Sequence, residues 1–222
     1  MLPTLSAVTP PVSGEQKTRK LLERPLNKSG LRSRLRSRRR AVSDADRSLF
    51  TRRIVRHVLR SGLLLRYRRI GIYLAHGTEI DTLALINTML GLGKTVLLPM
   101  LPAGRGKKLW FNPIEADTPW VLNRFGMTEN RSRYSVRAQA VDILFLPLLG
   151  YDDAGYRIGT GGGYYDASLA YLRQRQCWRK PYLIGMAYSC QHIADPLIPD
   201  PWDVPMNAIL TEAGLYRFAA RN

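Results

Sequence analysis

The 222-residue chain carries 34 Lys and Arg residues against 17 Asp and Glu residues, which gives a formal net charge of +17. The length suits one α/β domain, and a hydrophobic content of 45% excludes a wholly disordered chain. No apolar run approaches the roughly 20 residues of a membrane-spanning helix, and residues 1–14 lack the pattern of a secretory signal. Cys177 and Cys190 are too few for a disulfide framework, so we expect two buried thiols in a cytoplasmic protein.

The positive charge is concentrated in the N-terminal third of the chain. Residues 1–69 contain 19 Lys and Arg residues and 4 Asp and Glu residues, whereas residues 70–222 contain 15 and 13. Residues 1–27 mix Pro, Ser and charged residues without a sustained apolar period, which is typical of a disordered basic tail. We therefore expect a single folded domain over residues 28–222, with a body that is close to neutral.

Two helices are expected at the start of this domain, near residues 30–41 and 44–61. Apolar residues keep helical spacing there, and Ser43 followed by two aspartates is a typical helix start. Arginines recur at three- and four-residue steps along the first helix, at Arg32, Arg36, Arg39 and Arg40. Such a cationic face can bind the phosphates of a nucleic acid, bind the phosphates of a small ligand, or simply face solvent. Charge alone does not distinguish these three roles.

The rest of the chain alternates short apolar runs with helical patterns. Expected strands are Arg69–Ala75, Thr95–Met100, Lys108–Pro113, Ala140–Leu149, Tyr182–Tyr188 and Ala208–Thr211. Expected helices are Asp81–Leu92 and 163–176. This alternation predicts an α/β fold with a mainly parallel sheet that is covered on both faces. Ligands of such sheets lie beyond the carboxyl ends of the strands, so the loops 75–81 and 150–166 and the segment after Tyr188 are candidate site regions.

The run from Gly91 to Thr95, with sequence GLGKT, superficially resembles a phosphate-binding P-loop. That motif needs a glycine where Thr88 stands, and it needs a strand before it and a helix after it. Here a predicted helix precedes the glycines and a predicted strand follows them. We therefore expect Gly91 and Gly93 to form a helix C-cap and a turn.

The segment Gly155–Asp166, with sequence GYRIGTGGGYYD, is the strongest candidate for a ligand site. It has five glycines within nine residues, follows a predicted strand and opens a predicted helix, a context that favours phosphate binding by backbone amides. Arg157 adds a cation, Tyr164 and Tyr165 offer rings for stacking, and the Asp166 carboxylate is an oxygen ligand of the kind that magnesium prefers. The pattern predicts a phosphate or nucleotide site rather than an ordinary strand–helix connection.

Two carboxylates, Glu79 and Asp81, follow the first predicted strand, where a carboxylate can hold amine or amide donors of a substrate. For Asp81 we expect a helix cap, and for Glu79 a site role and a surface position both stay open. The three histidines, His57, His76 and His192, lack metal-ligand spacing and are expected to face solvent or to pack, although His76 lies near the proposed cleft. No G-x-S-x-G nucleophile elbow is present, which argues against hydrolase chemistry of that type.

Taken in order, these motifs resemble the 5-formyltetrahydrofolate cyclo-ligase family, also called 5,10-methenyltetrahydrofolate synthetase, over about residues 28–212. The matching positions are Lys28, Leu31 and Arg32 with the arginines to Arg40, Tyr73-Leu74 with Glu79 to Thr82, Asp142–Pro147, Arg157 with the run from Gly159 to Asp166, Gly185 with Ala187, and Asp200 with the run from Asp203 to Pro205. The glycine, tyrosine and aspartate element is highly specific, and the later Asp-Val-Pro segment reinforces it.

The resemblance implies a three-layer α/β/α domain with a mainly parallel, Rossmann-like sheet of the NagB/RpiA/CoA-transferase-like type. It also implies an ATP- and Mg²⁺-dependent cyclisation of 5-formyltetrahydrofolate to 5,10-methenyltetrahydrofolate with release of ADP and phosphate. In that reaction the formyl oxygen is phosphorylated and N10 of the folate then attacks the activated carbon. The enzyme implied is a cytoplasmic ligase of one-carbon metabolism, expected to be a monomer with no membrane partner.

The resemblance also assigns roles residue by residue. The ATP-contacting positions are Lys28, Arg32, Arg157, Gly159, Gly161, Gly162, Gly163, Tyr164 and Tyr165. The positions that contact the folate substrate are Leu74, Glu79, Thr160, Gly161, Gly162, Gly163 and Tyr164. Asp166 and Asp203 resemble two acidic magnesium positions, and no residue is expected to act as a covalent nucleophile. The first helix would then fold back over the triphosphate.

The sequence departs from the family pattern at three positions. Some members have Lys where this chain has Gly162, and others have a basic or large residue where it has Thr160. Asn207 stands where an acid is frequent, so the metal assignment is not extended to it.

Two other functions are compatible with the sequence. The first is a protein that binds RNA or another phosphate-rich partner through the arginine helix, although the near-neutral body favours the enzyme and makes nucleic acid a less expected partner. The second is a related enzyme that acts on another formyl or carboxyl compound, because fold does not fix substrate.

Overall fold

The computed structural model describes residues 28–174 and 180–219, so the predicted tail 1–27 and Cys177 lie outside the described residues. The described chain begins with α2 (Lys28–Arg40) and α3 (Asp44–Arg60), which confirms the two expected helices. Ser43 caps α3, because its Oγ accepts a hydrogen bond from the Asp46 N–H at 3.1 Å. This bond satisfies one of the amides that a helix start leaves without a partner.

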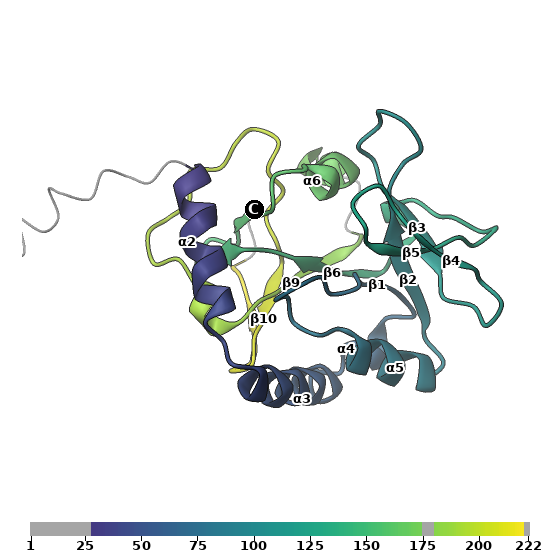
Figure 1. Ribbon diagram of the computed structural model, residues 1–222, viewed down its shortest axis with the longest axis horizontal. Coiled ribbons are helices and arrows are strands. Elements are labelled where there is room, and N and C mark those ends of the chain that lie inside the picture. Colours follow the sequence, from purple (N-terminus) through teal and green to yellow (C-terminus); the bar gives the residue numbers. More distant parts are fainter. Residues whose placement is uncertain (1–27, 175–179, 220–222) are drawn as a thin grey trace, which may run out of the picture.

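A seven-stranded mixed sheet forms the centre of the molecule, with the strand order β11-β10-β9-β6-β1-β2-β3 (Figure 1). Its strands are β1 (Arg69–Gly71), β2 (Thr95–Met100), β3 (Trp110–Pro113), β6 (Ile143–Pro147), β9 (Tyr182–Met186), β10 (Ala208–Leu210) and β11 (Leu215–Arg217). The five inner strands are parallel, and only the two edge strands, β3 and β11, pair in the antiparallel sense. The predicted mainly parallel sheet is confirmed.

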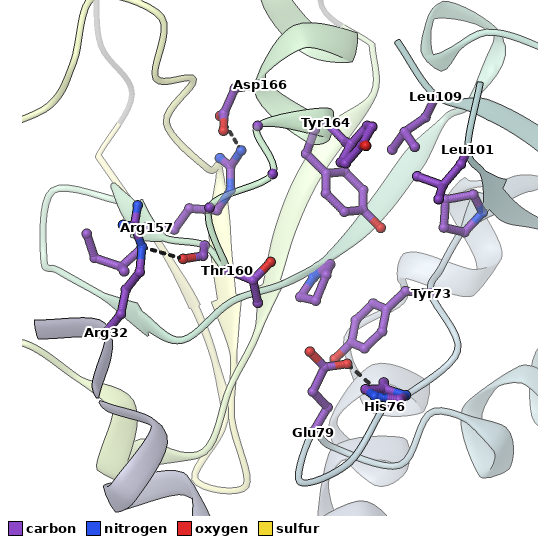
Figure 2. Close-up of a pocket in the computed structure, with 18 of the residues that line it drawn as sticks. Arg32, Tyr73, His76, Glu79, Leu101, Leu109, Arg157, Thr160, Tyr164 and Asp166 are labelled. Atoms are coloured by element: carbon purple, nitrogen blue, oxygen red, sulfur yellow. Dashed lines mark hydrogen bonds and ion pairs between the residues drawn. The ribbon is translucent and has the colours of Figure 1, made fainter. Parts of the chain in front are cut away.

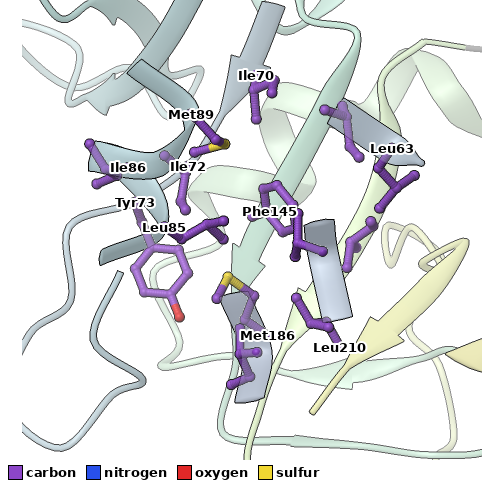
Figure 3. Close-up of a cluster of buried hydrophobic side chains, with 14 of the residues drawn as sticks. Leu63, Ile70, Ile72, Tyr73, Leu85, Ile86, Met89, Phe145, Met186 and Leu210 are labelled. Carbon is purple, nitrogen blue, oxygen red and sulfur yellow. The ribbon is translucent and has the colours of Figure 1, made fainter. Parts of the chain in front are cut away.

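Helices cover both faces of this sheet (Figure 1). α3, α4 (Leu63–Arg66) and α5 (Leu83–Gly91) pack on one face, and α6 (Tyr164–Leu169) with the 3₁₀ segment η2 (Ala170–Gln174) packs on the other. Figure 3 shows the first of these two cores, where Phe145 and Met186 of the sheet meet Leu85 and Met89 of α5. Alternate residues of β6 point into opposite cores, because side chains along a strand alternate between its two faces.

Several short elements were not predicted. They are the hairpin of β4 (Trp120–Leu122) and β5 (Thr128–Asn130), the hairpin of β7 (Gly150–Tyr151) and β8 (Arg157–Ile158), the 3₁₀ segments η1 (Ala138–Ala140) and η3 (Ser189–Gln191), and α4 and β11. The β7–β8 hairpin lies inside the segment predicted as one loop. The predicted helix 163–176 is also shorter in the structure, because the chain tightens to 3₁₀ after Leu169. Leu169 and Leu172 are both buried, and a period of three residues per turn places them on the same side.

The structure also tests three smaller predictions. Gly93 has a left-handed φ of +67°, and its N–H donates to the Leu90 carbonyl at 2.9 Å, which confirms a helix end in place of a P-loop, although the cap is Leu92 rather than Gly91. The N-cap of α5 is Thr82 rather than Asp81, but the Asp81 carboxylate accepts from the first amide of the helix, the Leu83 N–H, at 2.9 Å. The prediction of a buried thiol is wrong for Cys190, which is exposed because it lies on the surface segment η3. No helix in the described ranges is both long and apolar enough to cross a bilayer.

Candidate active site

A pocket of about 360 Å³ opens at the carboxyl ends of the parallel strands. Every residue to which the sequence assigned a site role lines it: Lys28, Arg32, Leu74, Glu79, Arg157, Gly159, Thr160, Gly161, Gly162, Gly163, Tyr164, Tyr165, Asp166 and Asp203. These residues come from α2, from the segment after β1, from residues 155–166, called the glycine segment below, and from the loop before β10. Figure 2 shows the glycine segment with Arg157 on one side of the pocket and Glu79 with Tyr73 on the other.

Helix α2 closes one side of the pocket because its apolar face is anchored on the body. Leu35 is fully buried, and the absence of a side chain at Gly150 allows this close contact, since a Cβ there would lie 2.7 Å from a Leu35 methyl. The anchored helix directs Arg32 at the glycine segment, where its Nε donates to the Gly159 carbonyl at 3.1 Å. Lys28, at the start of the helix, forms an ion pair with Asp200.

The glycine segment needs its glycines for conformation as well as for space. Gly161 and Gly163 have φ values of +112° and +69°, in a region that residues with a side chain rarely adopt. Gly162 has an ordinary φ, but a Cβ there would lie 2.8 Å from the ring of Tyr164. The lysine that some family members have at this position therefore requires a different placement of the tyrosine ring.

Arg157 and Asp166 form an ion pair at the pocket wall (Figure 2). The Arg157 side chain is only 6% exposed, and its second nitrogen donates to the Val204 carbonyl at 2.7 Å. The guanidinium is thus fixed by two partners from different segments. The predicted phosphate-binding cation and the predicted metal carboxylate are direct neighbours.

Two carboxylates of the pocket have the chemistry that magnesium requires. Asp166 pairs with Arg157, and one oxygen of Asp203 accepts from the Asp200 N–H at 2.8 Å. The described residues contain no cluster of three side chains that could hold a metal ion by themselves. Magnesium usually takes one or two carboxylates together with water and substrate phosphates, so this donor set fits it. The side-chain oxygen of Asn207 accepts from the Leu183 N–H at 2.8 Å, so this amide has a structural partner in β9.

Glu79 faces the glycine segment from the opposite side of the pocket (Figure 2). Its carboxylate pairs with Arg39 at 3.5 Å and accepts from the His76 N–H at 3.1 Å. The Glu79 side chain is 13% exposed and lines the pocket, so it is not a surface residue, and its site role stays a prediction.

Two tyrosines beside Glu79 are held in their protonated form. Burial, and then the charge of Glu79, raise the pKa of the Tyr73 and Tyr165 phenols above the ordinary value of tyrosine. Both side chains therefore keep an O–H at neutral pH and remain hydrogen-bond donors. Tyr73 lies in a predicted strand and is one of the positions that resemble the family, but no site role was predicted for it.

An apolar wall lines the same side of the pocket and was not predicted. Its residues all lie within a strand or directly beside one, and they are Leu98, Pro99, Leu101, Leu109, Met127 and Pro147. Tyr164 borders this wall, and its hydroxyl accepts from Arg124 at 2.6 Å. No sequence signal separates these residues from ordinary core residues, because the wall exists only once the β4–β5 hairpin folds beside β2. The rim residues Ile198 and Trp202, both exposed, were also missed.

A mainly parallel α/β sheet with a cationic, glycine-lined pocket at the carboxyl ends of its strands is typical of an enzyme that binds a phosphate-bearing substrate. The particular family follows from sequence comparison. Residues 24–212 match the model of the 5-formyltetrahydrofolate cyclo-ligase family, and the chain therefore belongs to this family.

Individual relatives agree with this result. The chain is 36% identical over 147 residues to a 5-formyltetrahydrofolate cyclo-ligase of Haemophilus influenzae, an alignment that covers 64% of this chain and 75% of the relative. It is 28% identical over 189 residues to the protein of the same name from Escherichia coli K12, covering 83% of this chain and all of the relative. The NMR structure of Aquifex aeolicus 5,10-methenyltetrahydrofolate synthetase superimposes with a TM-score of 0.73 at 25% identity, over 89% of this chain and 95% of that one.

Proposed function

We propose that this chain cyclises 5-formyltetrahydrofolate to 5,10-methenyltetrahydrofolate in the pocket described above, with ATP as the activating co-substrate. ATP-dependent 5-formyltetrahydrofolate cyclo-ligase activity follows from membership of the family. The observation that supports the proposed site is that one pocket joins a cationic glycine segment to an apolar, carboxylate-bearing wall. A triphosphate and a pterin ring need these two different surroundings side by side.

In this proposal the ATP phosphates lie along the glycine segment. Lys28, Arg32 and Arg157 neutralise their charge, and the backbone amides of the glycines approach them closely. Arg32 uses its Nε for the Gly159 carbonyl, so its two terminal nitrogens are directed to the ligand. In this proposal Tyr164 and Tyr165 lie next to both substrates, and each of them contacts ATP.

The folate lies against the opposite wall. Glu79 accepts hydrogen bonds from the amine and amide N–H groups of the pterin, which present two donors side by side. Leu74, together with the apolar wall, packs against the rings, and the segment from Thr160 to Tyr164 lies between the folate and the nucleotide. This arrangement brings the formyl oxygen towards the terminal phosphate.

The formyl group needs activation because amide resonance stabilises it and its oxygen is a poor leaving group. The formyl oxygen attacks the γ-phosphorus of ATP, a new P–O bond forms, and the bond to the bridging oxygen breaks to release ADP. N10 then adds its lone pair to the activated carbon, loses its proton, and expels phosphate as the C–O bond breaks. The chain contributes positioning and charge neutralisation, so no covalent nucleophile is required.

Asp166 and Asp203 are the residues proposed to hold Mg²⁺. When bound with the nucleotide, this ion neutralises charge on the phosphate oxygens. The Arg157–Asp166 pair holds the carboxylate at the pocket wall before the nucleotide arrives.

The proposal extends to the wider description of the protein. A monomeric state is part of the proposal. The order of the parallel strands, with helices on both faces, supports a Rossmann-like, NagB/RpiA/CoA-transferase-like fold with one domain over residues 28–222. Cytoplasmic location remains part of the proposal.

The direct test mixes purified protein with Mg-ATP and 5-formyltetrahydrofolate and follows the absorbance of the methenyl product. We expect product to form only when both ATP and Mg²⁺ are present, with one ADP released per product. A folded protein that leaves the folate unchanged under these conditions contradicts the proposal. Replacing the substrate by other formyl or carboxyl compounds tests the related-enzyme alternative in the same assay.

A further inference from the structure

Helix α2 carries a second inward-facing arginine that the assigned site does not use. Arg39 lies seven residues after Arg32, about 10 Å further along the helix. Its Nε donates to the Thr78 hydroxyl at 3.0 Å, and its NH1 lies 3.5 Å from a Glu79 carboxylate oxygen. Only 11% of its side chain is exposed. One rigid helix therefore contacts the glycine segment at one point and the Glu79 loop at another.

Arg47 of α3 stabilises the contact between Arg39 and the loop that carries Glu79. Its NH2 donates to the Arg39 carbonyl at 3.0 Å and its NH1 donates to the Thr78 carbonyl at 2.7 Å. The guanidinium also lies 5.8 Å from the centre of the Tyr188 ring, and the Tyr188 hydroxyl donates to the Glu79 carbonyl at 3.4 Å. The end of α2 and the Glu79 loop are thus joined by a closed set of polar contacts.

We propose that Arg39 is a positioning residue that holds the Glu79 carboxylate in the orientation that receives the folate. This inference rests on the proposed function, because it assumes that Glu79 binds the substrate. Without Arg39, the Glu79 carboxylate keeps the His76 N–H as its only hydrogen-bond partner among residues 28–174 and 180–219. A carboxylate with a single partner adopts more rotamers, and substrate binding must then select one of them.

The expected consequence is a specific loss of folate affinity. Arg39→Gln removes the charge and the several N–H donors of the guanidinium, but it retains a polar side chain that suits a helix. We expect KM for 5-formyltetrahydrofolate to rise about tenfold, the loss expected for one charge-assisted hydrogen bond, while kcat and KM for ATP stay within about twofold. Arg40→Gln is the matched control, because Arg40 is the next residue of the same helix and is exposed. This control removes the same charge and should leave all three constants unchanged.

A double-mutant cycle separates positioning from a general structural role. If Arg39 acts through Glu79, then adding Arg39→Gln to Glu79→Gln should change KM for the folate by less than about twofold beyond the single Glu79→Gln change. Arg39→Lys should give an intermediate KM, because an ammonium group restores the charge but not the simultaneous contact with Thr78 and Glu79. Thr78→Val removes the hydroxyl contact alone and should raise KM for the folate about twofold to threefold.

Three results overturn the inference: an unchanged folate KM in a folded Arg39→Gln variant, an equal effect of Arg40→Gln, or full additivity in the cycle. Circular dichroism confirms folding, and if Arg39→Gln does not fold, Arg39→Lys and Thr78→Val decide the question by the same folate KM. Failure of the proposed function itself is recognised separately, because the unmodified protein then forms no methenyl product at all.

Discussion

Two groups of arginines in the first two helices have the same chemistry but opposite surroundings. The inner arginines, Arg32, Arg39 and Arg47, are half-buried and donate to carbonyls, a hydroxyl or a carboxylate of the loops around the pocket. The outer arginines, Arg52, Arg53, Arg56 and Arg60, are exposed on the face of α3 that points away from the sheet, and none has an ion pair within residues 28–174 and 180–219.

The comparison shows that net charge is a poor guide to a phosphate site. Each arginine of either group adds the same charge to residues 1–69, yet within the described part of the chain only the inner arginines meet acceptors that fix the guanidinium in one orientation. A fixed guanidinium loses little further entropy when a ligand binds, whereas a solvated one must be ordered first. Function should therefore depend on the inner group, and the predictions below test that difference from the largest expected effect to the smallest.

The largest effect is expected for Arg157, which shares the inner environment although it lies on β8. Arg157→Ala removes a nearly buried cation from the proposed phosphate site and leaves the Asp166 carboxylate without its partner. We expect kcat/KM for ATP to fall about 100-fold or more, which corresponds to about 3 kcal/mol. Steady-state assays with varied ATP measure this, and Arg56→Ala is the control on the outer face. Wild-type kinetics in a folded Arg157→Ala protein remove this residue from the site.

The next effect concerns the anchor that directs the inner arginines. Leu35→Ala removes a fully buried side chain that packs α2 against Leu149, Ile158 and Ile193. We expect the free energy of unfolding to fall by about 2–4 kcal/mol, with a higher KM for ATP because Arg32 loses its fixed position. Leu49→Ala on exposed α3 surface is the control, and chemical denaturation should detect a change below about 1 kcal/mol. Equal losses from the two substitutions contradict the anchoring role.

A smaller effect is expected for the metal. Asp166→Asn removes one of two proposed magnesium carboxylates but keeps a side chain of the same shape that can accept from Arg157. We expect the Mg²⁺ concentration for half-maximal activity to rise about tenfold, with partial recovery of the rate at high Mg²⁺. Titration of activity with Mg²⁺ at fixed ATP measures this. An unchanged Mg²⁺ requirement removes Asp166 from the metal assignment.

Much of the fold could be predicted from local patterns. The strand Thr95–Met100 was predicted at the bounds that the structure shows, because its apolar run lies between a helix end and a turn that contains Pro, Gly and Lys. α2 and α3 were predicted within two residues, since Ser43 and the aspartates after it mark a helix start. The short strands β4, β5, β7, β8 and β11 were not predicted, because two or three residues are too few to show the alternation of apolar and polar side chains that marks a strand. The strand predicted over Arg69–Ala75 pairs only to Gly71, after which Tyr73 and Leu74 line the pocket.

The site could be predicted where its residues are close in sequence. The glycines and Asp166 lie within a dozen residues of one another, so the sequence alone indicated a phosphate or nucleotide site there. The roles of Arg39 and Arg47 could not be predicted, because each acts on a loop more than 30 residues away. Arg39 also lies between Arg38 and Arg40, and nothing in the sequence distinguishes it from them. Distinguishing one arginine from the next required the helix faces, which only the packing of α2 and α3 on the body defines.

The smallest effect on activity is expected from the outer arginines. Replacing Arg52, Arg53, Arg56 and Arg60 together by Gln keeps the helical propensity of α3 and removes no contact with the pocket. We expect kcat and both KM values to stay within about twofold, with a change in the free energy of unfolding of about 1 kcal/mol or less. A large loss of activity in this variant contradicts the division into inner and outer groups.

The variant with all four outer arginines replaced by Gln also tests whether the protein binds nucleic acid. Four exposed arginines at α-helical spacing can neutralise a few phosphates, so a single-stranded oligonucleotide should bind the unmodified protein weakly, with Kd about 10⁻⁵ M, and more weakly still as salt increases. Fluorescence anisotropy at two salt concentrations should show this binding reduced in the Gln variant while cyclo-ligase activity remains. Nanomolar, sequence-selective binding that depends on the outer arginines and is indifferent to Mg-ATP would instead assign a second function to this face. Because the outer arginines lie on an exposed face of α3 and do not line the pocket, either result leaves the assignment of the inner arginines intact.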